Sequence, residues 1–450
     1  MTAKVFYVSG HGYYLYDGLT NRIITIGADW TNNGNGFISE GDLLSRFRDD
    51  GIVSDGVWNT FNWRESFDFL KEKYETGLES LVLQVTRDCN LRCSYCAYSG
   101  NYRNMLPHSK DEMSEEMICR SIDFFMEHSS KSSKVVILFY GGEPLLRYKH
   151  LKMAVQYADK YGRQISYGIT SNGVALSPEI VKWLNNHPNV YLTITLNGLK
   201  HDDYRRTIDD KGSLQSILDN ISYVRNFYPN VWKNQIRFIA NIVSAQELPK
   251  LREFYSQIIQ KPPIMVSYIN IDYCDDEIKV LFKSDDMTDD EGVKKLQMEY
   301  IQSNDPFLKT LYDEKISMIH NRGICGEKEP VFLNSCMPMS WRLFVRTDGT
   351  FNMCEKVSDS ISLGNLQDGF NEERIKELYS QMKVFAEHNC RNCWAQRLCM
   401  YCYQDVIDEN GRLITHFTSD WCERSQQSIL RYLKLYVSIA NQNPEKLSGL

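Results

Sequence analysis

Three cysteines lie close together in the first quarter of the chain. Cys89, Cys93 and Cys96 are separated by three and then by two residues. A [4Fe–4S] cluster takes four ligands, one for each iron, so three thiolates from one loop leave one iron open to an external ligand. That iron can chelate a small molecule and pass an electron to it. A zinc knuckle and three buried structural thiols remain alternatives, although zinc prefers four ligands and paired CxxC hooks.

A second group of cysteines lies in the last third of the chain. Its members are Cys325, Cys336, Cys354, Cys390, Cys393, Cys399, Cys402 and Cys422. The chain has 450 residues, 13 cysteines and no recognisable signal peptide, which favours metal or redox use over disulfides. The two CxxC pairs also suit a structural zinc site, so zinc remains an alternative here as well.

Between residues 81 and 271, strand-like and helix-like segments alternate along the chain. Strand-like apolar runs occupy Leu81–Val85, Val135–Tyr140, Ile165–Thr170, Val190–Leu196, Ile236–Ile242 and Ile264–Ile271. Helical patterns occupy Glu112–His128, Tyr148–Tyr161, Pro178–Asn186, Ser213–Phe227 and Glu247–Gln260. This alternation predicts the α/β class, with a partial (β/α)6 TIM-like barrel. The near-continuous apolar runs are typical of parallel strands buried on both faces.

Polar motifs follow the predicted strands. They are Gly141-Gly142-Glu143-Pro144, Ser171-Asn172, Asn197-Gly198, Asn241 and Asp272-Tyr273-Cys274. Because the loops after the strands form the active face of a parallel barrel, we expect these motifs to lie beside the three-cysteine loop. A carboxylate there can accept hydrogen bonds from an ammonium group, and an arginine can pair with a carboxylate. Asp272 and Tyr273 are placed where a catalytic acid or base could work.

Over roughly residues 80–425 the sequence resembles the radical S-adenosylmethionine (SAM) superfamily. The resemblance implies that the open iron at Cys89, Cys93 and Cys96, the catalytic residues, binds SAM. Reductive cleavage of SAM then gives methionine and a 5′-deoxyadenosyl radical, which abstracts a hydrogen atom from the substrate. It also implies a set of residues that contact SAM: Tyr95, Gly142, Glu143, Ser171, Asn172, Thr195, Arg205, Arg206 and Asn241.

Within that set, the resemblance implies that Gly142 and Glu143 recognise the amino group and that Tyr95 packs near the adenine. Either Arg205 or Arg206 would pair with the carboxylate. One motif departs from the family, because this chain has Thr195-Leu-Asn197-Gly198 where Ser-x-Asp-Gly is common.

The second cysteine group resembles the SPASM extension, which binds two auxiliary [4Fe–4S] clusters in enzymes that modify peptides and proteins. The resemblance implies that Cys336, Cys354 and Cys402 hold the first auxiliary cluster. The second would be held by Cys390, Cys393, Cys399 and Cys422. Cys325 is the candidate fourth ligand of the first cluster, which otherwise has an open iron. The spacing departs from the usual pattern in having two residues between Cys399 and Cys402 where three are usual.

The chain is expected to divide into five parts. These are an N-terminal α+β domain (1–76), the partial barrel (77–274), a linking region (275–330), the cysteine-rich auxiliary-cluster domain (331–425) and a C-terminal helix (426–450). The first part, with predicted strands and helices near Glu40–Phe47 and Trp63–Tyr74, resembles the leader-peptide-binding domain of peptide maturases. An ordinary N-terminal cap on the barrel is an equal alternative.

These features together predict an enzyme that installs a thioether in a ribosomally made precursor peptide, with SAM and three [4Fe–4S] clusters as cofactors. Carbon–carbon crosslinking and formylglycine formation in a sulfatase are the enzymatic alternatives, and a zinc-scaffolded binding module is the alternative from another class. A flavodoxin- or ferredoxin-like protein would supply electrons. The net charge of −7 disfavours nucleic acid as a partner. Without a long apolar run, we expect no membrane association and a cytoplasmic location.

Overall fold

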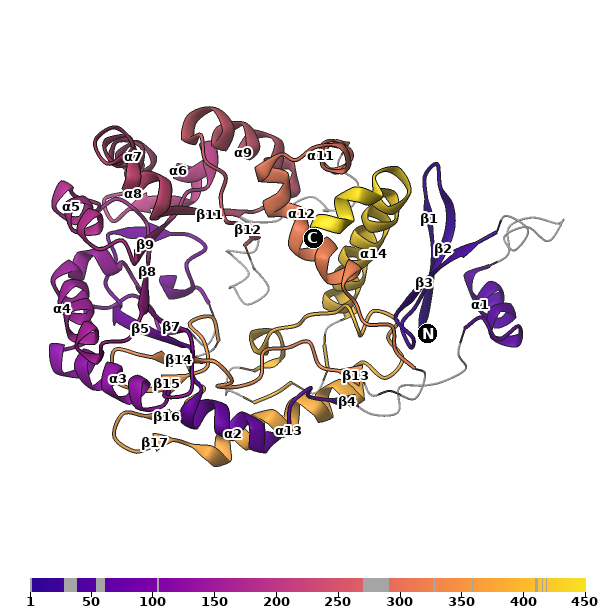
Figure 1. Ribbon diagram of the computed structural model, residues 1–450, viewed down its shortest axis with the longest axis horizontal. Helices are drawn as coiled ribbons and strands as arrows, with labels where there is room; N and C mark the ends of the chain where they lie inside the picture. Colours follow the sequence, from indigo (N-terminus) through magenta and orange to yellow (C-terminus); the bar gives the residue numbers. More distant parts are fainter. Residues whose placement is uncertain are drawn as a thin grey trace.

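The computed structural model describes residues 2–27, 39–53, 61–102, 105–269, 291–326, 329, 331–357, 359–408, 412–414, 416–417 and 419–450. Its central feature is an eight-stranded sheet in the order β12-β11-β9-β8-β7-β5-β14-β15 (Figure 1). The strands predicted from the sequence are β5 (Ser80–Thr86), β7 (Val135–Gly141), β8 (Ile165–Ser171), β9 (Val190–Thr195), β11 (Ile236–Ile242) and β12 (Met265–Tyr268). They are parallel neighbours in chain order, which confirms the α/β class with a parallel sheet.

Helices cover the outer side of these strands in Figure 1. They are α3 (Glu115–Glu127), α4 (Tyr148–Ala158), α5 (Pro178–Asn186), α7 (Leu214–Phe227), α8 (Pro229–Asn234) and α9 (Leu248–Phe254). In α3 the Ser114 hydroxyl accepts from the Met117 N–H and begins the helix, and Ile118, Ile122 and Phe125 form its buried face. Apolar residues spaced three or four apart in this way pack α3 against the sheet.

Two strands that the sequence did not predict extend the sheet beyond β5. β14 (Arg342–Val345) pairs parallel with β5, and β15 (Phe351–Asn352) returns antiparallel to β14. Leu343 and Val345 are fully buried. The region expected to carry auxiliary clusters is therefore hydrogen-bonded directly to the first strand of the parallel sheet.

A small antiparallel sheet forms the N-terminal part. It consists of β1 (Ala3–Val8), β2 (Gly12–Asp17) and β3 (Arg22–Ile26), and its own core packs against α1 (Glu40–Asp49). Its other face joins the main core, where Tyr16 packs edge-on against Trp394. The helix expected near Trp63–Tyr74 is α2 (Phe67–Thr76), which starts later because the Ser66 hydroxyl caps it.

The remaining elements connect and close the molecule. They are β4 (Phe61–Asn62), β13 (Val331–Phe332), β16 (Gly364–Asn365), β17 (Gly369–Phe370), α11 (Glu291–Gln302), α12 (Pro306–His320), α13 (Glu372–Asn389) and α14 (Ser419–Gln442). The predicted boundary at residues 425–426 falls inside α14, a continuous helix that packs against β1. Within the described residues, no helix combines the length and apolarity needed to cross a membrane.

Candidate active site

The three-cysteine loop follows the carboxyl end of β5. It contains β6 (Leu91–Cys93) and a short 3₁₀ turn, and the Leu91 N–H donates to Cys89 Sγ over 3.4 Å. Burial above all, together with neighbouring charges that include that of Cys93, raises the pKa of Cys89 and Cys96 to about 12. Neighbouring thiols disfavour the ionisation of Cys89 and Cys96, and a cluster's iron atoms would relieve that repulsion. The donor set therefore fits a [4Fe–4S] cluster with one open iron.

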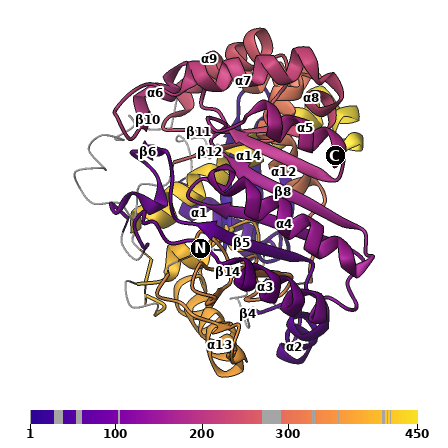
Figure 2. The same ribbon diagram turned by 90° about the vertical axis from the view of Figure 1, so that its left-hand side faces the viewer.

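A second short strand lies against this loop. β10 (Arg205–Thr207) pairs antiparallel with β6, so that Arg205 lies opposite Cys93, and Figure 2 shows the two strands side by side. Arg205 is buried, and its Nη1 donates to Tyr95 Oη (2.9 Å) while its Nε has no hydrogen-bond partner among the described residues. Arg206 is half exposed and bound to Asp210. Of the two predicted arginines, only Arg205 reaches the site.

Glu143 is completely buried at the end of β7. One carboxylate oxygen accepts from the Leu145 N–H (2.9 Å) and the Ser171 hydroxyl (2.8 Å), and the other accepts from the Asn172 N–H (2.7 Å). Burial raises the pKa of Glu143, while the three donors and the charge of Arg205 oppose that rise. The structure thus brings together Glu143, Ser171 and Asn172, as the sequence predicted for strand ends.

The two glycines before Glu143 lie in close contact with the start of the three-cysteine loop. A Cβ on Gly142 would lie 2.1 Å from the Asp88 carbonyl oxygen, and one on Gly141, at φ +127°, 2.1 Å from that of Thr86. The Gly142 and Glu143 N–H groups donate to these same two carbonyls, each over 2.8 Å. The glycines therefore hold the start of the three-cysteine loop against β7.

The Tyr95 hydroxyl is shared by two of the predicted residues. Asn197 Nδ2 donates to it over 2.7 Å, beside the bond from Arg205, and Asn197 Oδ1 accepts from the Asn241 N–H (2.9 Å). An aspartate in place of Asn197 could accept but not donate, so the amide explains the departure from the family motif. Thr195 is buried at the end of β9 in the same region.

Four cysteines of the second group line a cavity of about 310 Å³ between the end of α13 and the start of α14. They are Cys390, Cys393, Cys399 and Cys422. Ser425 Oγ lies 3.2 Å from Cys399 Sγ, and Gln426 Nε2 donates to Cys393 Sγ (3.5 Å). Burial raises the pKa of Cys390, and Cys393, Cys399 and Cys422 add to that rise. These four thiols fit the predicted ligand set of one cluster.

The other cysteines of the second group are less closely grouped. Cys336 and Cys402 are exposed as residues. Desolvation of the Cys402 thiol, with the charges of Asp405 and Cys336, raises its pKa to about 11. Cys354 Sγ lies 3.3 Å from Glu355 Oε2, and Arg342 Nη1 contacts both residues. Glu355 was not predicted from the sequence as a site residue, although it directly follows a predicted ligand.

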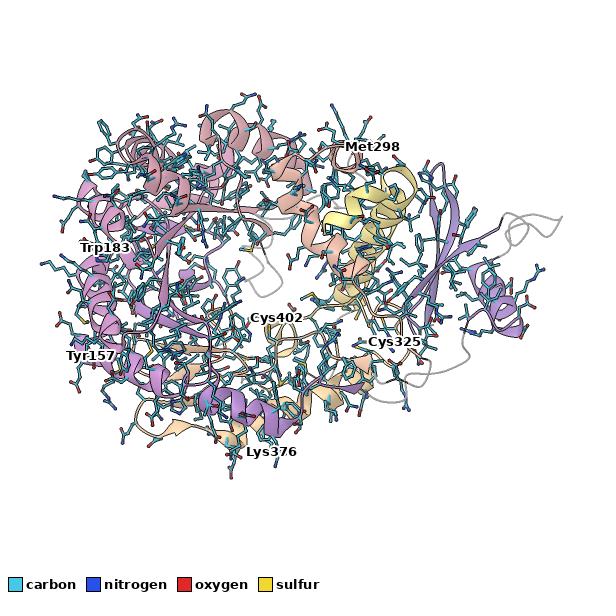
Figure 3. The ribbon with its side chains drawn as sticks, viewed as in Figure 1. Tyr157, Trp183, Met298, Cys325, Lys376 and Cys402 are labelled. Carbon is cyan, nitrogen blue, oxygen red and sulfur yellow. The ribbon has the colours of Figure 1, made fainter. Side chains whose placement is uncertain are left out.

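Cys325 lies away from Cys402 in Figure 3. Its N–H donates to the Thr20 carbonyl of the N-terminal sheet and its thiol to the Gly323 carbonyl. The structure thus places the candidate fourth ligand beside the N-terminal sheet. In the described part of the chain, no three Cys, His, Asp or Glu side chains are arranged to hold a single metal ion.

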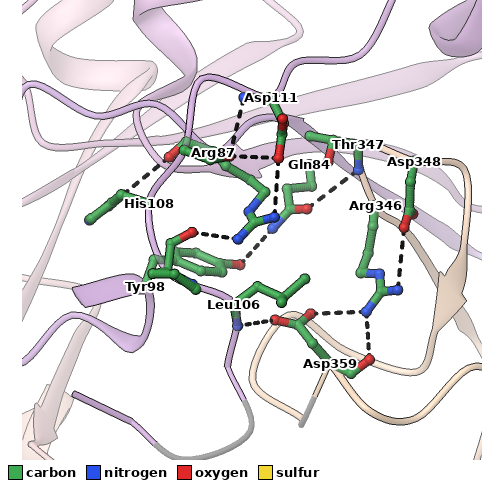
Figure 4. Close-up of polar contacts among 12 residues, drawn as sticks. Gln84, Arg87, Tyr98, Leu106, His108, Asp111, Arg346, Thr347, Asp348 and Asp359 are labelled. Carbon is green, nitrogen blue, oxygen red and sulfur yellow. Dashed lines mark hydrogen bonds and ion pairs between the residues drawn. The ribbon is translucent and has the colours of Figure 1, made fainter. Parts of the chain in front are cut away.

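A cavity of about 440 Å³ lies between the loop after β14 and the segments on either side of the three cysteines (Figure 4). Gln84 of β5 donates to Tyr98 Oη (3.1 Å) and accepts from the Thr347 N–H (3.4 Å). Asp359 accepts from the Leu106 N–H (2.7 Å) and pairs with Arg346 (3.3 Å). These contacts tie the segment after the cysteines to the loop after β14.

Three predicted positions, Asp272, Tyr273 and Cys274, lie outside the described residues. The twelve cysteines that the structure describes are all free thiols. Cys119, on α3, packs against Met153 at 3.9 Å and lies outside both cysteine sets.

Comparison with known proteins shows what the part of the chain that forms this site is similar to. Residues 83–239 match the model of the Radical SAM superfamily, a segment that runs from β5 into β11. This segment, which holds the three-cysteine loop, Glu143, Ser171, Asn172 and Arg205, is therefore similar to the domain of radical SAM proteins.

Individual relatives are similar mainly over this domain. The radical SAM cyclopropyl synthase TigE of Paramaledivibacter caminithermalis is 25% identical over 196 residues, 41% of each chain. The cysteine-type anaerobic sulfatase-maturating enzyme of Clostridium novyi is 24% identical over 187 residues, 40% of this chain and 48% of the relative. Proteins described as GTP 3′,8-cyclase also match. The chain spans about half the length of the curated relatives it matches.

A solved structure shows likeness over a longer stretch. Native anSMEcpe with bound AdoMet and Cp18Cys peptide covers 81% of this chain and 99% of its own, with a TM-score of 0.59. Sequence identity is 15%, so this likeness concerns the fold.

Proposed function

We propose that this protein matures a ribosomally made precursor peptide by linking a cysteine sulfur to a carbon atom as a thioether. The observation that carries the proposal is the presence of two separate cysteine sets. Three thiols lie beside Glu143 and Arg205, and four others surround a cavity of their own. One cofactor class, the [4Fe–4S] cluster, accounts for both sets. With the first auxiliary set, the proposed total is three clusters.

Bound at the open iron, SAM would supply a 5′-deoxyadenosyl radical. The residues around it can hold its charged end. A carboxylate offers about four acceptor positions, and Glu143 uses three, which leaves one for an ammonium group. Arg205 keeps its Nε free for a carboxylate while Tyr95 holds Nη1.

Closing a thioether from a carbon radical releases one electron and the proton of the thiol. The auxiliary clusters would take that electron, and a flavodoxin- or ferredoxin-like partner would provide the electron that cleaves SAM. Cys336, Cys354 and Cys402 would leave one iron open unless Cys325 completes the set. An open iron suits a substrate thiolate, which is why we place thioether formation first.

The N-terminal sheet supports a peptide as the substrate. In the described residues β3 pairs only with β2, so one sheet edge is available for an added strand. We propose that the leader of the precursor binds there. Carbon–carbon crosslinking and formylglycine formation use the same radical step, and the likeness to a sulfatase-maturating enzyme favours the latter as the second candidate.

The test is an anaerobic assay of the reconstituted protein with reductant and SAM, followed by co-expression with candidate precursor peptides. We expect 5′-deoxyadenosine, and a product that has lost two hydrogen atoms together with one free thiol. Loss of two hydrogens with the thiol retained would indicate a carbon–carbon link, and an aldehyde would indicate formylglycine. Bound zinc without iron, and no SAM cleavage, would leave a zinc-scaffolded binding module.

A further inference from the structure

His201 is a fully buried histidine beside the proposed SAM site that belongs to none of the sequence motifs above. It begins α6 (His201–Tyr204), the short helix that leads into β10. Its Nδ1 lies 3.2 Å from the Asn197 backbone nitrogen, and its Nε2 lies 3.2 Å from Ser213 Oγ. Both ring nitrogens are thus engaged by residues of neighbouring loops.

The direction of each hydrogen bond follows from the donors. A backbone N–H can only donate, so Nδ1 of His201 accepts, and a neutral ring then carries its proton on Nε2. Nε2 therefore donates to Ser213 Oγ, and the Ser213 hydroxyl donates to the Arg205 carbonyl over 2.7 Å. One continuous chain of hydrogen bonds runs from Asn197 through the imidazole and Ser213 to Arg205.

We propose that His201 is a positioning residue that sets Asn197 and Arg205 at the correct separation for SAM, an inference that rests on the proposed function. The side chains of these two residues meet again on the Tyr95 hydroxyl. The His201 ring holds the backbones of Asn197 and Arg205, the latter through Ser213. The side chains of the same two residues both donate to the Tyr95 hydroxyl, so the contacts form a closed ring that includes the Arg205 guanidinium.

The environment keeps this imidazole neutral. Burial, and secondarily the positive charge of Arg205, lower the pKa of His201 to about 3. Protonation at Nδ1 would also direct an N–H against the Asn197 N–H. The hydrogen-bond direction therefore stays constant at neutral pH.

Two near-isosteric variants each remove one of the two hydrogen bonds of the His201 ring. His201→Asn keeps an acceptor at the Nδ1 position and loses the donor to Ser213, whereas His201→Gln keeps that donor and loses the acceptor. On reconstituted protein, equilibrium dialysis with labelled SAM gives the dissociation constant, and EPR of the reduced cluster reports SAM at the open iron. We expect His201→Asn and Ser213→Ala each to weaken SAM binding about fivefold to tenfold, as loss of one hydrogen bond would.

The double variants provide the decisive comparison. Ser213→Ala should have a smaller effect in the His201→Asn protein than in the His201→Gln protein, because only the latter keeps the hydrogen bond from residue 201 to Ser213. Independent, additive effects in both backgrounds, or an unchanged dissociation constant in every variant, would overturn the proposal. If His201→Asn does not fold, Ser213→Ala alone and with His201→Gln carries the test.

Controls distinguish this inference from the proposed function. His187→Asn, at the end of α5 where the ring contacts the Trp183 carbonyl, should leave SAM binding unchanged. Iron content and unfolding temperature identify variants that merely misfold. If the unaltered protein does not bind SAM, the proposed function fails, whereas normal binding by all variants contradicts only the role of His201.

Discussion

Arg205 and Arg206 are adjacent in the sequence but lie in different environments. They occupy β10, and successive side chains of a strand point to opposite sides. Arg205 is 6% exposed and faces the three-cysteine loop, whereas Arg206 faces solvent and Asp210. The sequence left both open as candidates because a three-residue strand paired with a loop more than a hundred residues earlier has no local signature.

Replacing Arg205 by lysine should weaken SAM binding by about tenfold or more. A lysine ammonium is a single point donor, so it cannot hold Tyr95 and a carboxylate at once in the planar geometry of a guanidinium. Arg206→Lys is the matched control and should bind SAM as the unaltered protein does. Equal losses in the two variants, measured by equilibrium dialysis, would contradict the assignment of Arg205.

His201 also predicts a dependence of stability on pH. Its pKa of about 3 in the folded protein is below its ordinary value of 6.5, so the unfolded chain takes up a proton that the folded site excludes. Stability is therefore full above pH 6.5 and falls as the pH decreases toward 3. Between pH 7.5 and 5.5 this one group should cost about 1.4 kcal/mol of unfolding free energy.

Denaturant unfolding of the protein and of His201→Asn at both pH values measures this cost. The variant should lose less stability on acidification by about that amount, since asparagine does not titrate. An identical pH dependence in both proteins would show that His201 is protonated in the folded state or accessible to solvent.

At the scale of elements, the six parallel strands could be predicted because each is a continuous apolar run between helical patterns. β14 and β15 could not, since Arg342–Val345 is short and its partner β5 lies some 260 residues earlier. The assignment of the cysteines to sets follows from the resemblance to known families. The Tyr95 hydrogen bonds do not, because they depend on how three separate loops meet. Asp272 and Tyr273 remain predictions.

Gly142 provides a test of how β7 supports the three-cysteine loop. Gly142→Ala would place a methyl group 2.1 Å from the Asp88 carbonyl, so the two segments must separate. Overpacking of this kind costs about 1–3 kcal/mol, and we expect a lower unfolding temperature and weaker cluster retention. Gly449→Ala, where no atom lies within 4 Å, is the control. Equal behaviour of the two variants in calorimetry and iron analysis would refute this role.

At the scale of the whole molecule, the cysteine sets predict a total metal content. Three clusters require roughly twelve irons per chain after anaerobic reconstitution. Cys422→Ala should remove about four of them, because this residue completes the set around the 310 Å³ cavity. Cys119→Ala, which removes a packing thiol on α3, should retain all of them. Iron loss in both variants, or in neither, would contradict the assignment.

The N-terminal sheet is attached to the auxiliary region through the turn between β2 and β3. Arg397, which lies between Cys393 and Cys399, donates to the carbonyls of Gly18 and Leu19, and the Arg322 side chain donates to that of Asn21. The proposed leader-binding sheet is thus anchored at the turn before β3, and these contacts do not involve the edge of β3 itself. A peptide added at that edge would leave these anchoring contacts in place.

The position of β14 limits which C-terminal truncations and exchanges the fold can tolerate. β5 is buried along its whole length, and β14 satisfies the backbone groups on one side of it. A chain ending before β14 would expose an apolar strand edge, which recruits edges of other chains and leads to aggregation. An exchange of C-terminal regions between two proteins of this kind would therefore succeed only if the incoming segment brought a strand in the same register.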